Sequence, residues 1–370
     1  MDTFPHKTLI PNRAAHLIAR ARLIELLHKI TERQLITISA PAGYGKTSLL
    51  IEFAQNAPLP VCWYTLDPSD QDPWEFLEYF TAAINVRFPG SMKQTTALLE
   101  GHRRSELAWI ITSFTQEIYA NGQHLIVIID DWHLVEHRSE INEIVSQLLR
   151  RCPNCHIILA SRHYPSLPNI TLLAARRQLL SINENHLRFT ASETQELLLA
   201  EGLEMTDQKT EELTQKYNGW ITGMLLLLQI TDPEGTGQFS DVWAERQVYH
   251  YLAEQVFDLQ TPELCDFLCE SSLLDELTPD HCNTYLQRSD SRRMLSILHR
   301  HHLFVNEIDR SVLRYHPIFR EFLQEHFSTI DPERYRALAQ RIARIYADNG
   351  QWLLAFKLLM MIGERAAARD

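Results

Sequence analysis

The sequence predicts an α/β fold, in which a parallel sheet is covered by helices, followed by an all-α helical domain, a winged-helix domain and the start of a helical arm. Three observations predict it. Short apolar runs alternate with amphipathic segments in the first half, a glycine-rich loop follows the first of these runs, and helical patterns with one hairpin fill the second half. The chain has 370 residues, a length at which roughly two to four domains are expected.

The first domain is predicted over residues 1–189, because the alternation of strands and helices that is typical of parallel sheets extends that far. Each expected strand is a continuous apolar run, as in strands that are buried on both faces. The expected strands are Leu35–Ser39, Val61–Leu66, Leu125–Ile129 and Ile157–Ser161. The expected helices between them are Thr47–Ala54, Trp74–Phe88, Leu107–Tyr119 and Ile141–Arg150.

An all-α helical domain is predicted over residues 190–247. It begins with the capping box Thr190-Ala-Ser-Glu193, in which the threonine hydroxyl can accept from the glutamate amide while the glutamate side chain reaches back. Further helices are expected at Lys209–Tyr217 and Gly223–Ile230. The proline and glycines of Asp232–Gln238 predict a loop.

A winged-helix domain is predicted over residues 248–331, because a group of helices ends there in a β-hairpin. The expected helices are Tyr251–Phe257, Pro262–Cys269, Pro279–Leu286 and Arg293–His301. The hairpin is expected to pair Leu303–Ile308 with Val312–Tyr315 around a turn at Asp309–Ser311. Residues 332–370 are expected to be helical throughout and to start a helical arm. Its apolar face is expected to contain Trp352, Ala355, Leu358 and Leu359.

The composition argues against several classes of protein. A net charge of −12 disfavours a chain whose main task is to neutralise a nucleic-acid backbone. The longest apolar runs, such as Met224–Leu228, are too short to cross a membrane, and the N-terminus lacks an apolar signal core. Six scattered cysteines are typical of reduced thiols, so we expect a cytoplasmic protein. Cys152 and Cys155 form a C-x-x-C pair, but no second pair supplies the other ligands of a structural zinc site.

The segment Ala40-Pro-Ala-Gly-Tyr-Gly-Lys-Thr47 matches the phosphate-loop pattern G-x-x-x-x-G-K-[ST] except at its first position. Because an apolar strand enters the loop and a helix leaves it, the sequence predicts a P-loop NTPase that binds ATP or ADP with Mg²⁺. Lys46 would supply positive charge to the phosphates, and the Thr47 hydroxyl would coordinate the metal. The nucleotide-binding residues are expected to be Ala42, Gly43, Tyr44, Gly45, Lys46, Thr47 and Ser48. An accidental glycine-rich turn is the alternative interpretation.

Charged residues follow two of the other expected strands. Asp130 and Asp131 come directly after Leu125–Ile129, and Arg162 follows Ile157–Ser161. Parallel sheets bind ligands at the carboxyl ends of their strands. We therefore expect Asp130 to hold Mg²⁺ together with Thr47, Asp131 to orient water as a general base, and Arg162 to contact the γ-phosphate. The catalytic residues of the prediction are Asp131, Lys46 and Arg162.

With these residues in view, the chain resembles the nucleotide-binding oligomerisation region of the MalT-type regulators. These belong to the signal-transducing ATPases with numerous domains, the STAND class, whose sheet is AAA+-like. The resemblance covers nearly the whole chain and includes alanine at position 40. It rests on Ser39–Ser48, Trp63-Tyr-Thr-Leu-Asp67, Ile128–Leu134, Leu159–Arg162, Gly219-Trp220 and Tyr315-His-Pro-Ile-Phe319.

The resemblance implies a switch in which ADP holds a closed monomer and ATP permits self-association. It also implies slow hydrolysis, an inducer bound by a sensor that this sequence does not contain, and a C-terminal effector. We expect this effector to regulate transcription, and proteolysis and defence are the alternative outputs. Arg20 and Arg22 are similar to the segment that covers the base, although a solvated helix start is equally consistent with them. His316 matches the histidine that contacts the ADP β-phosphate. Gly219-Trp-Ile221 stands where the class often has Gly-x-Pro, so Ile221 would contact the base without the rigidity of proline.

Two other functions remain open at this level. The winged helix could bind DNA directly through Arg288, Arg292, Arg293, Arg300 and the histidines at 299 and 301–302, although the acidic whole makes nucleic-acid binding by this region the less favoured interpretation. An AAA+-like motor would need fast turnover and an arginine supplied by a second subunit. The sequence offers no placed candidate beyond Arg162 for that role.

Overall fold

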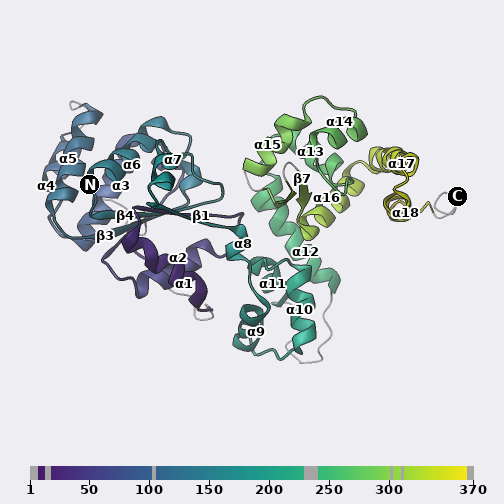
Figure 1. The fold of residues 1–370 in the computed structure, drawn as a ribbon, viewed down its shortest axis with the longest axis horizontal. Coiled ribbons are helices and arrows are strands. Elements are labelled where there is room, and N and C mark those ends of the chain that lie inside the picture. Colours follow the sequence, from purple (N-terminus) through teal and green to yellow (C-terminus); the bar gives the residue numbers. More distant parts are fainter. Residues whose placement is uncertain are drawn as a thin grey trace. The chain divides into compact units, whose positions relative to one another are not determined.

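The structure is a computed structural model that describes residues 7–12, 18–101, 106–228, 241–300, 303–309 and 312–364. For residues 228, 241–246 and 306–309 it describes the backbone alone. The chain divides into two compact units, Met1–Met205 and Thr206–Asp370 (Figure 1). The domain boundaries expected at residues 189, 247 and 331 stay predictions.

The first unit is built on a five-stranded sheet with the order β2-β3-β4-β1-β5, and all of its neighbouring strands are parallel. Parallel strands need crossover connections, which helices supply here. The strands are β1 (Leu35–Ser39), β2 (Val61–Thr65), β3 (Leu125–Asp130), β4 (Cys155–Ser161) and β5 (Leu179–Asn183). The four predicted strands are confirmed, and β1, β3 and β4 are buried along their whole length.

Helices cover both faces of this sheet (Figure 1). Helices α1 and α2 lie on one face, and α3 to α7 lie on the other, where they enclose the main hydrophobic core with β2, β3 and β4. The helices of this unit are α1 (Ala21–His28), α2 (Lys46–Gln55), α3 (Pro73–Arg87), α4 (Lys93–Glu100), α5 (Leu107–Ala120), α6 (Ser139–Arg151), α7 (Ile170–Ala175), α8 (Glu184–Leu187) and α9 (Ala191–Ala200). The predicted P-loop-type α/β architecture is therefore present.

The sequence analysis missed the edge strand β5 and the helix α4. β5 contains Ser181 and Asn183, and most of its residues are only half-buried, so it lacks the continuous apolar run of the inner strands. Its position is set by pairing with β1, in the register Leu35 opposite Leu179. The capping box of α9 has both predicted hydrogen bonds, and α9 belongs to the first compact unit.

The second unit is mostly helical and contains the predicted hairpin. Its helices are α10 (Asp207–Lys216), α11 (Ile221–Leu228), α12 (Asp241–Leu252), a π-helical turn over Ala253–Phe257, α13 (Pro262–Ser271), α14 (Pro279–Leu286), α15 (Ser291–Arg300), α16 (Pro317–Ile330), α17 (Pro332–Asp348) and α18 (Trp352–Met361). Strands β6 (Val305–Asp309) and β7 (Val312–Tyr315) are antiparallel. The predicted loop at Asp232–Gln238 and most of the predicted turn lie outside the described residues.

The expectation that the arm is helical throughout is wrong at Gly350. This residue has a φ of 73°, in the left-handed region that glycine adopts readily, and the helix stops there between α17 and α18. On α18 the predicted apolar face is buried at Ala355 and Leu358, whereas Trp352 is 66% exposed. Within the described residues, no helix has both the length and the apolar character needed to cross a membrane.

A close contact inside the second unit explains the glycine at position 223. Trp220 is fully buried, and a methyl group added at Gly223 would lie 2.4 Å from its ring and 2.7 Å from the ring of Tyr217. Aromatic side chains in a packed core have little room to move away. The small residue on α11 therefore allows both rings to pack against this helix.

We predict that Gly223→Ala destabilises the chain by about 1–3 kcal/mol, the usual cost of overpacking a core. Urea unfolding followed by circular dichroism measures this as a lower midpoint. Lys357→Ala, on an exposed part of α18, is the control and should stay within about 0.5 kcal/mol of the parent. A parent-like midpoint for Gly223→Ala would show that the aromatic pair can shift freely.

Candidate functional site

The loop between β1 and α2 has the backbone geometry of a phosphate-binding loop. Gly43 and Gly45 have φ values of 80° and 75°, which non-glycine residues rarely adopt, and Gly45 precedes the first residue of α2. A turn of this kind followed by a helix N-terminus directs backbone N–H groups to one side and favours anions. The loop thus lies where β1 ends, as the sequence predicts.

Lys46 is the first residue of α2 and is buried in this loop. Its Nζ donates hydrogen bonds to the carbonyl oxygens of Ala40 at 2.8 Å and Pro41 at 2.9 Å. Burial lowers the pKa of Lys46 to about 8, while the carboxylates of Asp130 and Asp131 act in the opposite direction. A bound phosphate would favour the charged form of this side chain.

Thr47 and Asp130 meet directly, although 83 residues separate them in the chain. The Thr47 hydroxyl donates to Oδ2 of Asp130 at 2.6 Å. Asp130 is almost fully buried at the end of β3, and burial followed by the charge of Asp131 raises its pKa to about 6. A hydroxyl and a carboxylate side by side are the oxygen donors that Mg²⁺ prefers, so the two residues fit the predicted metal role.

The strand order explains why the charged residues come together. β4 lies between β3 and β1, so the ends of these strands place Asp130, Arg162 and the phosphate loop at one edge of the sheet. Asp131 has a φ of 60°, which is uncommon for a residue with a side chain. Burial raises its pKa, and the charges of Lys46 and Arg162 lower it. The charge of Asp131 in turn raises the pKa of Lys46, and the charge of Arg162 lowers it.

The sequence analysis missed a histidine next to this acidic pair. Nδ1 of His133 lies 3.8 Å from Oδ1 of Asp131, and its ring packs edge-on against His163. His163 in turn contacts Oε1 of Glu136 at 3.0 Å. Burial, followed by the charge of Arg162, lowers the pKa of His133 to about 3, so its ring is neutral at ordinary pH. The sequence does place His133 two residues after Asp131, and this position could have indicated that it lies near the site.

Tyr44, one of the predicted nucleotide-binding residues, directs its side chain into the protein interior. It is fully buried, and its hydroxyl donates to Oε1 of Glu184 at 3.0 Å. Only the backbone of Tyr44 is thus placed to face a phosphate. No pattern in the sequence pointed to Glu184, because the contact joins residues 140 positions apart.

Arg20 and Arg22 converge on the carboxylate of Glu193. Their Nη2 atoms lie 3.3 and 3.0 Å from Oε2 of that residue. Both also donate to the carbonyl oxygen of Arg188, at 3.0 and 2.7 Å. The Arg20 side chain is buried over the ring of Phe189, while that of Arg22 is 39% exposed. The two arginines therefore tie the entry of α1 to the start of α9.

Three residues of the second unit, Gly219, Ile221 and His316, are also predicted to contact the nucleotide. Nε2 of His316 donates to the carbonyl oxygen of Tyr217 at 2.9 Å, and the His316 ring packs edge-on against Trp220. Gly219 has a φ of 68° and Ile221 is buried at the start of α11. The structure thus brings Gly219, Ile221 and His316 together within this unit, and their contact with a nucleotide stays a prediction.

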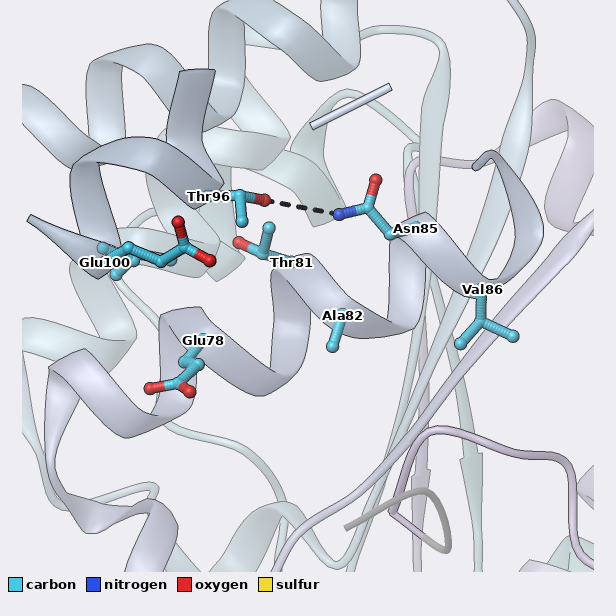
Figure 2. A pocket seen from close by; sticks show the side chains of 8 residues that line it. Glu78, Thr81, Ala82, Asn85, Val86, Thr96 and Glu100 are labelled. Carbon is cyan, nitrogen blue, oxygen red and sulfur yellow. Dashed lines mark hydrogen bonds between the residues drawn. The ribbon is translucent and has the colours of Figure 1, made fainter. Parts of the chain in front are cut away.

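A hollow of about 360 Å³ lies between α3 and α4 (Figure 2). Glu78 and Glu100 face it from the two helices, with the Asn85–Thr96 hydrogen bond at one end. None of its described lining residues is cationic. Carboxylates repel phosphate groups, so this hollow is unsuited to a nucleotide. The strand-end site is the better candidate.

The structure also describes the surroundings of two other features considered in the sequence. Cys152 and Cys155 are fully buried, and burial raises the pKa of Cys152 to about 12, so neither thiol is poised for redox chemistry. No described group of three histidine, cysteine, aspartate or glutamate residues is placed to hold a metal ion. Arg288 and Arg293 of the second unit pair with carboxylates, which reduces the positive charge that a DNA backbone would meet.

We predict that ADP affinity, measured without Mg²⁺, falls about tenfold between pH 7 and pH 9. The pKa of Lys46 is about 8, and a bound phosphate raises it, so binding above that pH requires proton uptake. Fluorescence titration at each pH measures the affinity. Lys46→Arg stays charged throughout and should bind with little pH dependence. A flat profile for the parent chain would contradict the role of the lysine.

Comparison with known proteins supports the assignment of the fold. Residues 253–335 match the family model described as the MalT winged helix domain. The chain is 28% identical over 350 residues to the HTH-type transcriptional regulator MalT of Vibrio parahaemolyticus, which covers 92% of this chain and 38% of that protein. It is 30% identical over 335 residues to the same regulator of Yersinia pestis, covering 87% and 36%. The chain therefore spans less than two-fifths of the length of these relatives.

Among solved structures, the chain is similar to the Walker-type ATPase of Pyrococcus abyssi, with a TM-score of 0.59 at 14% sequence identity. The alignment covers 84% of this chain and 97% of that one. At this identity the likeness shows the fold alone. The predicted resemblance is confirmed: the chain is similar to the MalT-type transcriptional regulators over most of its length, its fold is similar to that of a Walker-type ATPase, and residues 253–335 match the MalT winged helix domain.

Proposed function

We propose that this chain is the ATP/ADP-dependent switch region of a regulator. It would bind ADP at rest and ATP when activated, with slow hydrolysis that resets the switch. The observation that carries the proposal is the contact between Thr47 and Asp130 behind a loop with two left-handed glycines. Together with Lys46, these residues place two oxygen donors and one cation where β1 and β3 end.

The residues at this edge of the sheet can be given separate tasks. The backbone N–H groups of residues 42–48 and the Lys46 ammonium would bind the phosphates. Thr47 and Asp130 would hold Mg²⁺, which when bound neutralises charge on the phosphate oxygens. Asp131 would orient the attacking water and accept its proton, and Arg162 would stabilise the charge that develops on the γ-phosphate. The neutral His133 ring would add a hydrogen-bonding group beside Asp131 without adding charge.

The remaining predicted contacts concern the base and the resting state. The Nη1 atom of Arg20 is buried and has no hydrogen-bond partner among the described residues. This supports the proposal that Arg20 lies near the base, where a ligand atom could accept from it. His316 contacts Tyr217 and Trp220, the close chain neighbours of Gly219 and Ile221, which supports a shared ligand for these residues. We further propose that ATP promotes self-association, that an inducer acts through a sensor outside this chain, and that the effector acts on transcription.

The first test is to denature the purified protein and identify any released nucleotide by chromatography. We expect about one ADP or ATP per chain. Lys46→Ala should carry none and should bind added ADP at least about a hundredfold more weakly, because a buried charge-assisted contact to phosphate is lost. Lys29→Ala, an exposed lysine of the same unit, should behave as the parent. A parent without any affinity for ATP or ADP would overturn the proposal.

A second test separates hydrolysis from binding. Asp131→Asn should reduce the turnover of ATP about a hundredfold or more while leaving the dissociation constant for ADP within about threefold. Phosphate release measures the first quantity and fluorescence titration the second. Asp207→Asn, at the exposed start of α10, is the matched control. Parent-like turnover in Asp131→Asn would remove the residue from the catalytic role.

A further inference from the structure

The side chain of Tyr44 begins a series of polar contacts, the first of which, to Glu184, is buried. Its hydroxyl donates to Oε1 of Glu184 at 3.0 Å. The same oxygen accepts from Nη2 of Arg188 at 2.9 Å. Tyr44 is fully buried and Glu184 is 7% exposed, so water does not compete strongly for these groups. Burial and the nearby charge of Glu184 raise the pKa of Tyr44 well above its usual range, so its hydroxyl stays a donor.

The series continues from α8 to the start of α9. The carbonyl oxygen of Arg188 accepts from Arg20 and Arg22, and both guanidinium groups also contact Glu193. Oε2 of Glu193 in turn accepts from the backbone N–H of Thr190 at 3.0 Å and so completes the capping box of α9. The series runs from Tyr44 to the first turn of α9 within the first unit. Its links are hydrogen bonds and ion pairs, apart from the step through the covalent chain of Arg188, whose side chain contacts Glu184 and whose carbonyl oxygen contacts the two arginines.

The position of Tyr44 makes this series sensitive to the phosphate loop. It lies between Gly43 and Gly45, the two left-handed residues of the loop. A ligand that fixes the backbone of these residues therefore fixes the phenol as well. At the buried Tyr44–Glu184 contact a donor or acceptor left unpaired away from water costs about 1–3 kcal/mol, so the two side chains hold each other in place.

We propose that Tyr44 is a positioning residue that couples the phosphate loop to α9 through Glu184, Arg188 and the Arg20–Arg22–Glu193 cluster. The inference rests on the proposed binding of nucleotide at this loop. It adds a specific consequence to it: occupation of the loop stabilises the first turn of α9, the last helix of the first unit. The state of the loop is thereby communicated to the segment that leads along the chain into α10.

The test is hydrogen exchange at the backbone amides of residues 191–197, measured by mass spectrometry with and without saturating ADP. In the parent we expect ADP to slow exchange in this segment at least about fivefold, the lower end of typical coupling between sites. In Tyr44→Phe, saturated with ADP at its own affinity, the slowing should be less than about twofold. Saturation matters because it separates the coupling from any loss of affinity.

The chain offers a matched control for this variant. Tyr64 is a second fully buried tyrosine of the same unit, and its hydroxyl donates to a buried carboxylate, Asp70, at 2.8 Å. Tyr64→Phe therefore removes a similar hydrogen bond outside the series and should retain the full effect of ADP on α9. Glu184→Ala is a second variant within the series. It removes the oxygen that accepts from both Tyr44 and Arg188, and it should lose the effect in the same way as Tyr44→Phe.

A measurement without nucleotide keeps the coupling testable if the parent does not bind ADP. Exchange in residues 191–197 should then be at least about fivefold faster in Tyr44→Phe than in Tyr64→Phe. Absence of binding alone would overturn the proposed function. An unchanged α9 in a parent saturated with ADP, a full ADP effect in Tyr44→Phe, or an equal loss in both tyrosine variants would each overturn the coupling.

Discussion

The parallel pairing of β1 with β4 is the constraint on which the candidate site depends. Ser39 lies opposite Ser161 in this pairing, so the phosphate loop and Arg162 leave the sheet at the same level. β4 also pairs with β3, which brings Asp130 to the same edge. If one strand shifted by one residue in either pairing, its side chains would move to the opposite face of the sheet. The contact between Thr47 and Asp130 is therefore a result of the sheet and not of local sequence.

Burial controls the chemistry of the groups that this edge collects. It lowers the pKa of Lys46 to about 8 and raises that of Asp130 to about 6, because burial destabilises the charged form of each side chain. A bound anion would stabilise the charged lysine, and a bound cation would stabilise the charged aspartate. His133 is kept neutral for the same reason. A site with one cation and two acids beside each other is stabilised by a ligand that carries both charges, and a metal–nucleotide complex has this property.

The sequence predicted the parts of this site that depend on local pattern. The loop from Ala42 to Ser48 and the acids at 130 and 131 are predicted as site residues because strand, loop and helix signals are contiguous in the chain. His133 and Glu184 were missed because their roles arise only from tertiary contacts. Strand β5 escaped for a related reason, since its edge position is set by pairing with β1 and not by an apolar run. Arg20 and Arg22 were found through family resemblance, which did not reveal Glu193 as their partner.

A phosphate loop can be mobile before its ligand binds, and ordering it then reduces affinity. In this chain the buried phenol of Tyr44 already restrains the loop between its two glycines. A loop that is restrained in advance loses less conformational entropy when it binds a ligand, so it binds more tightly. Tight binding is what the proposed switch, with its slow hydrolysis, would require. A motor that must release its product on every cycle gains less from a loop anchored in this way. The anchoring thus agrees with a switch on physical grounds that are independent of the family resemblance.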